Sequence, residues 1–411
     1  MQNSAVVVPP DWGRRTERAK ERIDELAQDL DKLSQEIWSH PELCYEEHHA
    51  HQVLTDLLER EGFEVTRHYI LETAFRATYG RDGGAHVCVI CEYDALPQIG
   101  HACGHNLIAE CGAGAGLGIK AAMEMDELPV GRVTVIGTPA EEGGGGKKHL
   151  IAGGAFKEMD IAMMAHPYAH NVSRPTALSM QVMTIHFTGH AAHASATPWQ
   201  GVNALDAAVM CYTSISVMRQ QFKPNWRVHA IFTKGGVQPN IIPEEAELLY
   251  YLRTPDEEQM QVLKKKVEEC ARGAAMATGC AEKCTYGCSY ANVIHNGVIA
   301  STYERHAENL GCTCPEEVRR EQGGSTDMGN VSYVLPSIHP KFGIPTDSAT
   351  HNPGFTKWAG MPEAQLPTLI QAKALALTAL DLMDPSLDLL QRAKAEFEEI
   401  VGGLVPPDDH L

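Results

Sequence analysis

Two residues in a short turn can bind the same metal ion. The segment GHACGHN at residues 100–106 places the thiol of Cys103 two positions before the imidazole of His105. Thiolate and imidazole are preferred ligands of Zn²⁺, with bonds of about 2.0–2.3 Å. A Cys-x-His pair in a turn is often purely structural, so the pair needs further ligands before it indicates a metal site.

A pair of carboxylates supplies the second piece. The segment PAEEGGGG at residues 139–146 has Glu141 beside Glu142. Adjacent carboxylates repel each other unless a cation compensates for their charge. One of the two can ligate a metal, while the other stays free to take a proton from an activated water. A solvated acidic loop is the simpler alternative.

Two single histidines complete the set. His166 lies in AHP at residues 165–167, and His351 lies in HNP at residues 351–353. Together with the thiol, the imidazole and one carboxylate they make five ligands. Five ligands exceed one tetrahedral site but suit two divalent metals, Zn or Mn, that share a bridge. The thiolate is the natural bridging candidate.

Strands and helices alternate around these segments. The sequence predicts buried strands over 86–91, 133–137 and 161–165, and a Gly/Ala-rich helix from about 105 to 125. The segments above follow these strands, where open α/β sheets keep their sites. The alternation predicts a catalytic α/β/α sandwich domain.

The pattern changes between about residues 178 and 290. There the predicted order is strand, helix, strand, strand, helix, strand, which is typical of a ferredoxin-like α+β unit. The sequence therefore predicts a catalytic domain formed by residues 1–177 and 291–411, with an inserted lid or dimerisation domain at residues 178–290.

The composition of the chain excludes some functions. The 411 residues carry 34 Lys and Arg against 53 Asp and Glu, a formal charge of −19. An acidic protein repels phosphate backbones and anionic lipid, so neither nucleic acid nor a membrane is expected as a partner. Residues 1–15 do not read as a signal peptide. The 12 cysteines, without a disulfide-scaffold spacing, favour a reducing cytoplasm.

The motifs named above resemble those of a known family. HACGHN, PAEEGGGG, AHP and HNP are similar to motifs of the aminoacylase/carboxypeptidase family of dinuclear metallopeptidases, within its amidohydrolase subfamily. Longer stretches resemble its dipeptidases for basic carboxyl-terminal residues, the beta-alanyl-lysine dipeptidases. These stretches are CEYDALPQIGHACGHNLIAE (91–110), NALDAAV (203–209), PNIIP (239–243) and GSTDMGNVSYV (324–334).

The resemblance assigns roles to the catalytic domain. It implies that Cys103 bridges two metals and that the other ligands are His105, Glu142, His166 and His351. It makes Glu141 the general base, and Asp94 of the Asp-Ala-Leu-Pro turn an acid that orients a ligand. Many family members have Asp where this chain has Asn106, so Asn106 is not expected to be a ligand.

The resemblance also assigns roles to the lid. His193, in GHAAHAS at residues 189–195, matches a histidine that polarises the scissile carbonyl and can reach the site of a neighbouring subunit. Asn240 and Arg253 match positions that hold an amide or carboxylate oxygen of the substrate. A homodimer formed through the lid is therefore expected.

The resulting hypothesis is a metal-dependent hydrolase of dipeptides or N-acyl amino acids, with a dipeptidase for basic carboxyl-terminal residues as its leading form. An N-acyl-amino-acid or aminobenzoyl-glutamate amidohydrolase, possibly biosynthetic in purpose, is the alternative within enzymes. A catalytically silent metal-binding or assembly protein is the alternative outside them. Three further histidines, His48, His49 and His51, are expected to be solvated on an acidic helix.

Overall fold

The computed structural model describes residues 12–125, 131–314 and 324–407. The expectation that residues 1–15 are not a signal peptide concerns mostly residues 1–11, which lie outside the described residues. The chain divides into two compact units. Unit 1 comprises Met1–Thr176, Val293–Gly323 and Asn330–Gly403, and unit 2 comprises Ala177–Asn292, Gly324–Gly329 and Leu404–Leu411. Unit 2 thus takes in Gly324–Gly329, a segment that the sequence assigned to the catalytic domain.

Unit 1 is built on a six-stranded sheet with the order β1-β2-β4-β3-β5-β11. Strand β3 is central and parallel to both of its neighbours, β4 and β5. All seven of its residues are buried, as expected for an apolar strand covered on both faces. The strands of this unit are β1 (Glu64–Arg67), β2 (Phe75–Arg81), β3 (His86–Glu92), β4 (Gly131–Thr138), β5 (Ile161–Met163), β6 (His166–Tyr168), β11 (Ser337–Ile338) and β12 (Lys341–Gly343).

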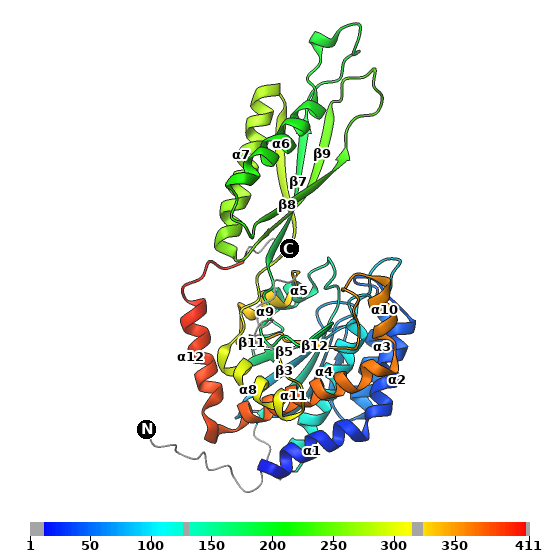
Figure 1. Cartoon of the computed structure of the whole chain (residues 1–411), viewed down its shortest axis with the longest axis vertical. Helices are drawn as coiled ribbons and strands as arrows, with labels where there is room; N and C mark the ends of the chain where they lie inside the picture. The colour runs from blue at the N-terminus through cyan, green and yellow to red at the C-terminus, as the bar shows by residue number, and fades with distance from the viewer. Residues whose placement is uncertain (1–11, 126–130, 315–323, 408–411) are drawn as a thin grey trace. The chain divides into compact units, whose positions relative to one another are not determined.

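Helix α4 is the buried helix of unit 1, and all of its residues from His105 to Met123 are buried. It packs against β3 and β4, and α1, α2 and α11 pack around it (Figure 1). The helices are α1 (Trp12–Glu25), α2 (Ala27–Ser39), α3 (His48–Arg60), α4 (His105–Met123), α5 (Gly146–Ala152), α8 (Gly297–Asn309), α10 (Pro353–Ala359), α11 (Gln365–Met383) and α12 (Leu389–Val401). A short helix, α9 (Met328–Ser332), has residues in both units. The mixed α/β class predicted from the sequence is confirmed.

Two helices of unit 1 differ from simple sequence patterns. The periodicity from Ile23 to Ile37 predicts one helix, but the chain forms α1 and α2 with a break at Leu26, whose dihedral angles are φ −94° and ψ 6°. The segment Pro362–Met383 is long and apolar enough to cross a membrane, yet 72% of its most apolar window is buried inside the protein. It serves here as a core helix, since α11 packs on α4 and α8.

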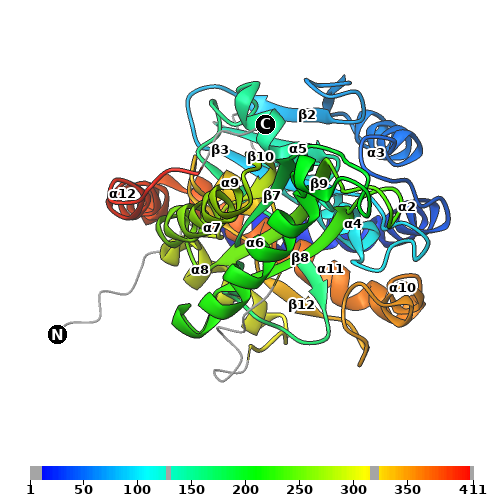
Figure 2. The ribbon, with the colours of Figure 1, turned by 90° about the horizontal axis from the view of Figure 1, so that it is seen from above.

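Unit 2 is a ferredoxin-like unit. Its antiparallel sheet has the order β10-β7-β9-β8, and its helices α6 and α7 pack side by side against that sheet (Figure 2). This arrangement confirms the predicted strand-helix-strand-strand-helix-strand order. The elements are β7 (Ser179–Thr188), α6 (Ala204–Met218), β8 (Arg227–Lys234), β9 (Glu245–Thr254), α7 (Glu257–Thr278) and β10 (Ala281–Tyr290).

Candidate metal centre

The predicted site residues of unit 1 gather at one edge of the sheet. Asp94 follows β3, Glu141 and Glu142 follow β4, and His166 comes three residues after β5. Because these three strands are parallel, their carboxyl ends meet at the same edge. His105 opens α4 directly after the turn that leaves β3. Segments far apart in the sequence therefore converge on a single site.

The five predicted ligands form two groups that share a thiol. Cys103, His105 and His166 make one group, and Cys103, Glu142 and His351 make the other, with the ligand atoms of each group within 4.8 Å of one another. The Sγ atom of Cys103 lies 3.4 Å from Nε2 of His166 and 3.6 Å from Nε2 of His351. This is the arrangement that a thiolate bridge between two metals requires.

Unsatisfied buried atoms show that this donor set fits metal ions. Nε2 of His105 and Oε1 of Glu142 are buried without a hydrogen-bond partner among the described residues, and such orphans are rare in native proteins. Burial raises the pKa of the Cys103 thiol well above its usual range, so a thiolate there needs a cation beside it. Burial lowers the pKa of His166 to about 4, which keeps its imidazole in the neutral form that binds metals.

Asp94 orients both the histidine and the glutamate turn. Its Oδ1 accepts a hydrogen bond from Nδ1 of His105 at 3.1 Å, and its Oδ2 accepts one from the backbone N–H of Glu142 at 2.9 Å. Although burial opposes its ionisation, the hydrogen bond from His105 holds the pKa of Asp94 below its usual value. The contact leaves Nε2 of His105 as the nitrogen available to a metal.

Glu141 lies outside the two groups that share Cys103, but it forms another group of possible ligands with Glu92 and His105. Its Oε2 is 3.9 Å from Nε2 of His105, and its side chain is 9% exposed. A carboxylate this close to a ligand, yet reachable from solvent, is placed where a base can meet an attacking water.

Sequence reasoning missed an acid next to this group. Glu92, the last residue of β3, is fully buried, and its Oε1 lies 3.3 Å from Nε2 of His105. Its Oε2 forms a fully buried ion pair with Nζ of Lys147 at 2.6 Å. The signal available was an acid that ends an otherwise apolar strand, a placement that costs free energy unless a cation is near.

The connector between α2 and α3 supports the glutamate turn. Oε1 of Glu47 accepts hydrogen bonds from the backbone N–H groups of Tyr45 at 3.0 Å and Ala140 at 2.8 Å, and the Tyr45 hydroxyl donates to the carbonyl of Gly144 at 2.6 Å. Burial raises the pKa of Glu47 to about 7. These contacts hold Ala140 in a left-handed conformation, with φ 60°, directly before Glu141.

Two further backbone positions fix the thiol turn. Gly104 has φ +78°, and a Cβ there would lie 2.6 Å from Cγ of Pro167, so a larger residue would push away the segment that carries His166. His351 has φ 62°, and its N–H donates to the carbonyl of Ala102 at 2.9 Å. Strain of this kind persists where the surrounding contacts enforce it.

Asn106 belongs to the packing of α4. Its Nδ2 donates to Oγ of Ser34 at 3.0 Å and to the carbonyl of Ala359 at 2.9 Å. These two contacts join α4 to α2 and to the end of α10.

Two predicted residues of unit 2 are brought together. His193 pairs with Ile241 as an isolated bridge, and the N–H of Ala194 donates to the carbonyl of Asn240 at 3.0 Å. Both His193 and Asn240 are exposed. The backbone N–H of Ala196 donates to Nδ1 of His193 at 3.3 Å, so the proton of a neutral ring sits on Nε2, which can donate to a carbonyl oxygen.

Arg253 lies far from that pair within unit 2. It is near the carboxyl end of β9, where Nη1 donates to Oγ of Ser325 at 2.8 Å, whereas Asn240 precedes the start of β9 (Glu245–Thr254). At a rise of about 3.3 Å per residue, such a strand holds its two ends roughly 30 Å apart. Arg253 and Asn240 of one chain therefore lie at opposite ends of β9.

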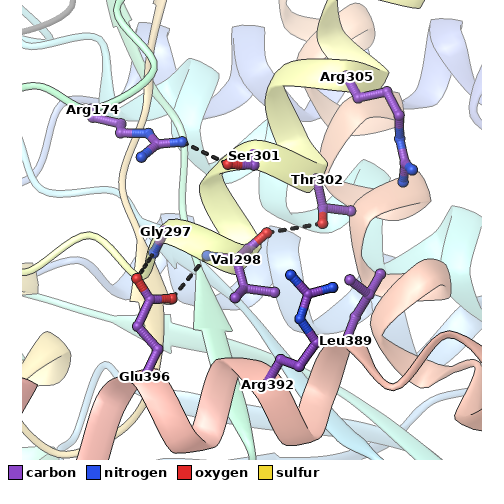
Figure 3. A pocket seen from close by; sticks show the side chains of 9 residues that line it. All are labelled: Arg174, Gly297, Val298, Ser301, Thr302, Arg305, Leu389, Arg392 and Glu396. Carbon is purple, nitrogen blue, oxygen red and sulfur yellow. Dashed lines mark hydrogen bonds between the residues drawn. The ribbon is translucent and has the colours of Figure 1, made fainter. Parts of the chain in front are cut away.

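Unit 1 has a pocket of about 430 Å³ that is lined by none of the predicted site residues. Arg174, Arg305 and Arg392 line it between α8 and α12 (Figure 3). Arg174 pairs with Glu304 through two contacts, at 3.0 and 3.1 Å. Glu396 accepts hydrogen bonds from the first two N–H groups of α8, at 3.0 and 2.9 Å. The contacts of Glu396 tie α12 to the start of α8, and the pair of Arg174 with Glu304 ties the segment around Arg174 to α8.

The fold and the site together define a class of protein, a metallohydrolase with an α/β catalytic unit and an inserted ferredoxin-like unit. A family model described as a peptidase dimerisation domain matches residues 179–278. The chain is 50% identical to a Xaa-Arg dipeptidase of Mus musculus, over 93% of this chain and 91% of that protein. It is 48% identical to a Xaa-Arg dipeptidase of Homo sapiens, with the same two shares covered. The chain belongs to the M20 family of metallopeptidases.

More distant similarities include a hydrolase subunit and a solved peptidase structure. The p-aminobenzoyl-glutamate hydrolase of Escherichia coli has a subunit that is 31% identical over 68% of this chain and 62% of that protein. A solved structure from Bacillus subtilis, described as a dinuclear metal-binding peptidase of the M20 family, superposes with a TM-score of 0.68 at 22% identity, covering 87% of this chain and 99% of that one. At this identity the structural likeness supports the fold.

Proposed function

We propose that the protein is a metal-dependent dipeptidase that cleaves dipeptide-like amides with a basic carboxyl-terminal residue, such as beta-alanyl-lysine. The identity of about 50% to two Xaa-Arg dipeptidases, over nearly the whole chain, carries this proposal. The likeness to a p-aminobenzoyl-glutamate hydrolase keeps an amidohydrolase of acyl or aminobenzoyl amino acids as the second candidate. A silent metal-binding role is disfavoured because Glu141 lies beside the ligand groups.

We infer that two divalent ions, Zn or Mn, are held by the two groups that share Cys103. The donor types of these groups, one thiol, three imidazoles and a carboxylate, support this assignment. Such ions, when bound, polarise the scissile carbonyl and lower the pKa of a nucleophilic water. Asp94 orients His105 for this role through the hydrogen bond at 3.1 Å.

The proton transfers fall to Glu141. It accepts the proton of the attacking water and passes it to the leaving amine, as general bases do in amide hydrolysis. His193 donates from Nε2 to the developing oxyanion, because the backbone of its own loop occupies Nδ1. Arg253 binds the substrate carboxylate, and its planar fork allows two parallel hydrogen bonds.

A substrate series tests the basic preference. The ratio kcat/KM should be higher for beta-alanyl-lysine than for amides ending in glutamate or leucine. Arg253→Ala should raise KM about 10- to 100-fold for every carboxylate-bearing substrate, because a hydrogen bond to a charged group contributes roughly 1.5–3 kcal/mol. The side-chain preference should stay unchanged.

Arg253→Lys is the matched control for this series. It keeps the charge but loses the fork, so its KM should lie between that of the wild type and that of Arg253→Ala. A higher kcat/KM for aminobenzoyl-glutamate than for beta-alanyl-lysine would replace the dipeptidase by the second candidate.

We further propose that unit 2 forms a homodimer whose sites are shared between subunits. The separation of Asn240 from Arg253 along β9 supports this, since a partner subunit can supply the group that the first subunit cannot. Strand β8 is a sheet edge, and Ile231 on β8 and Val217 on α6 are 61% and 71% exposed. An exposed apolar edge of this kind favours pairing with another chain.

Mixing two inactive variants tests the shared site. His193→Ala and Glu141→Gln subunits, after exchange, should recover about a quarter of wild-type activity, because half of the random C2 dimers are hybrids with one intact site. A mixture of Glu141→Gln and Glu142→Ala should recover none, since both changes lie in unit 1. Equal, negligible activity in the two mixtures, despite demonstrated exchange of subunits, would count against a shared site.

The cytoplasm is the proposed location. All 12 cysteines are free thiols in the described structure, and this supports a reducing compartment.

A further inference from the structure

A second group of metal-binding side chains lies in unit 1, outside the candidate metal centre. It consists of Glu36 near the end of α2, His40 directly after α2, and His49 in the first turn of α3. Glu36 and His40 are four residues apart, so they share one face of the helix end. The connector of residues 41–47 turns the chain back and places His49 against them.

The three side chains are close enough to hold one ion. Their ligand atoms lie within 4.8 Å of one another, and the rings of His40 and His49 have centroids 4.2 Å apart. Nε2 of His49 is 3.3 Å from Oε2 of Glu36. Ligand atoms around one tetrahedral zinc ion, with bonds of about 2.0–2.2 Å, lie roughly 3.4 Å apart. The contact between His49 and Glu36 already has this spacing, and pairs at the 4.8 Å limit would have to close by about 1.4 Å.

The nitrogen atoms are also poised for a metal. Nε2 of His49 is buried and has no hydrogen-bond partner among the described residues, while the side chain as a whole is 33% exposed, so the expectation of a solvated histidine holds for only part of the ring. Nδ1 of His40 donates to the backbone carbonyl of Glu36 at 2.9 Å. Nδ1 is also the His40 atom that lies 3.9 Å from Oε2 of Glu36, so His40 ligates a metal either through Nε2, with this contact fixing the tautomer, or through Nδ1 after the contact breaks.

The neighbouring histidines show that this arrangement is specific. His51 is buried, contrary to expectation, and bonds the carbonyl of Thr73 at 3.1 Å. The side chain of His48 is 57% exposed and faces Glu46 at 3.5 Å. Only His49 of the three joins the cluster with Glu36 and His40.

We propose that Glu36, His40 and His49 form a third divalent-metal site, for Zn²⁺, separate from the two metals of the candidate centre. Two imidazoles and one carboxylate select borderline ions such as zinc over Mg²⁺ or Ca²⁺, which prefer oxygen ligands. Three protein ligands leave the fourth position to water.

The site clamps a segment that the candidate centre depends on. Its ligands lie at both ends of the connector of residues 41–47. From this connector the Cys44 thiol donates to Oδ2 of Asp94 at 3.5 Å, and Glu47 holds the N–H of Ala140 at 2.8 Å. An ion bound to the native state alone stabilises that state by mass action. Zinc at this site therefore stabilises the end of α2 against the start of α3.

Counting metal tests the proposal. Full-length wild-type protein and a His40→Ala/His49→Ala variant are dialysed against buffered Zn²⁺, and the bound zinc is measured by elemental analysis. The variant should hold one equivalent fewer than the wild type, whatever number the candidate centre binds. His48→Ala is the matched control and should hold as much as the wild type. Equal zinc in the wild type and the double variant overturns the proposal.

A second measurement guards against misfolding of the double variant. His49→Gln keeps the size of the side chain roughly constant, and Co²⁺ replaces Zn²⁺. Cobalt absorption from the His/Glu site lacks the charge-transfer band of a thiolate ligand, so the difference spectrum of wild type minus His49→Gln should show d–d bands alone. A difference spectrum with a thiolate band, or no difference, contradicts the assignment. A wild-type spectrum with no thiolate band would instead count against the two-metal centre, whose ligands include Cys103.

Discussion

Replacing Glu141 by glutamine should lower kcat by about 10²–10⁴-fold, the usual contribution of general acid–base catalysis. The amide keeps the size of the side chain but cannot accept the proton of the attacking water. Bound metal should remain, because Glu141 lies outside the two ligand groups that share Cys103. Steady-state kinetics on beta-alanyl-lysine and elemental analysis of the same preparation measure the two effects.

Glu142→Gln is the matched control, since it makes the same chemical change one residue further along. Glu142 lies 3.4 Å from Nε2 of His351 and belongs to a ligand group, so this variant should lose metal together with activity. A Glu141→Gln enzyme that keeps its metal and a near-normal kcat would show that another group is the base.

Lys147→Met should destabilise the protein by about 3–5 kcal/mol, the usual effect of removing one partner from a buried ion pair. Nζ of Lys147 and Oε2 of Glu92 are 2.6 Å apart, and both side chains are fully buried. Methionine fills a similar volume but removes the Lys147 charge, which leaves the Glu92 carboxylate with His105, 3.3 Å away, as its remaining partner. The free energy of unfolding, from urea titration of chelator-treated protein, measures the loss.

Two further variants isolate the electrostatic effect. Lys20→Met removes an exposed pair of the same residue types, with Glu17 at 2.7 Å, and should cost less than about 1 kcal/mol. The double variant Glu92→Gln/Lys147→Met removes both charges and should recover part of the stability lost in Lys147→Met. If Lys147→Met and Lys20→Met unfold at the same urea concentration, the buried pair contributes no more than a surface pair.

The sequence alone was enough to predict the fold class and the chemistry of the site. Residues 86–91 are apolar without alternation, which indicates a strand buried on both faces, and β3 is such a strand. The order of elements between residues 178 and 290 indicated the ferredoxin-like unit. Whether a side chain can bind a metal depends on its residue type, so Cys103, His105 and Glu142 could be named as candidate ligands before their positions were known.

Other features depend on contacts between segments that are distant in the sequence. The division of the ligands into two groups around Cys103 arises because parallel strands bring their carboxyl ends to one edge. The pairing of Glu92 with Lys147 joins β3 to α5, 55 residues further along the chain. The contact of Glu47 with the N–H of Ala140 spans 93 residues.

His48, His49 and His51 show most clearly what the sequence alone could not predict. His48, His49 and His51 lie within one turn of α3 and have similar neighbours in the sequence, yet one is exposed, one faces Glu36 and one is buried. Helical periodicity determines that their side chains point in different directions. What each side chain meets there depends on where α2 and the strands pack. Residue types thus determined the available chemistry, while tertiary packing decided which side chains meet.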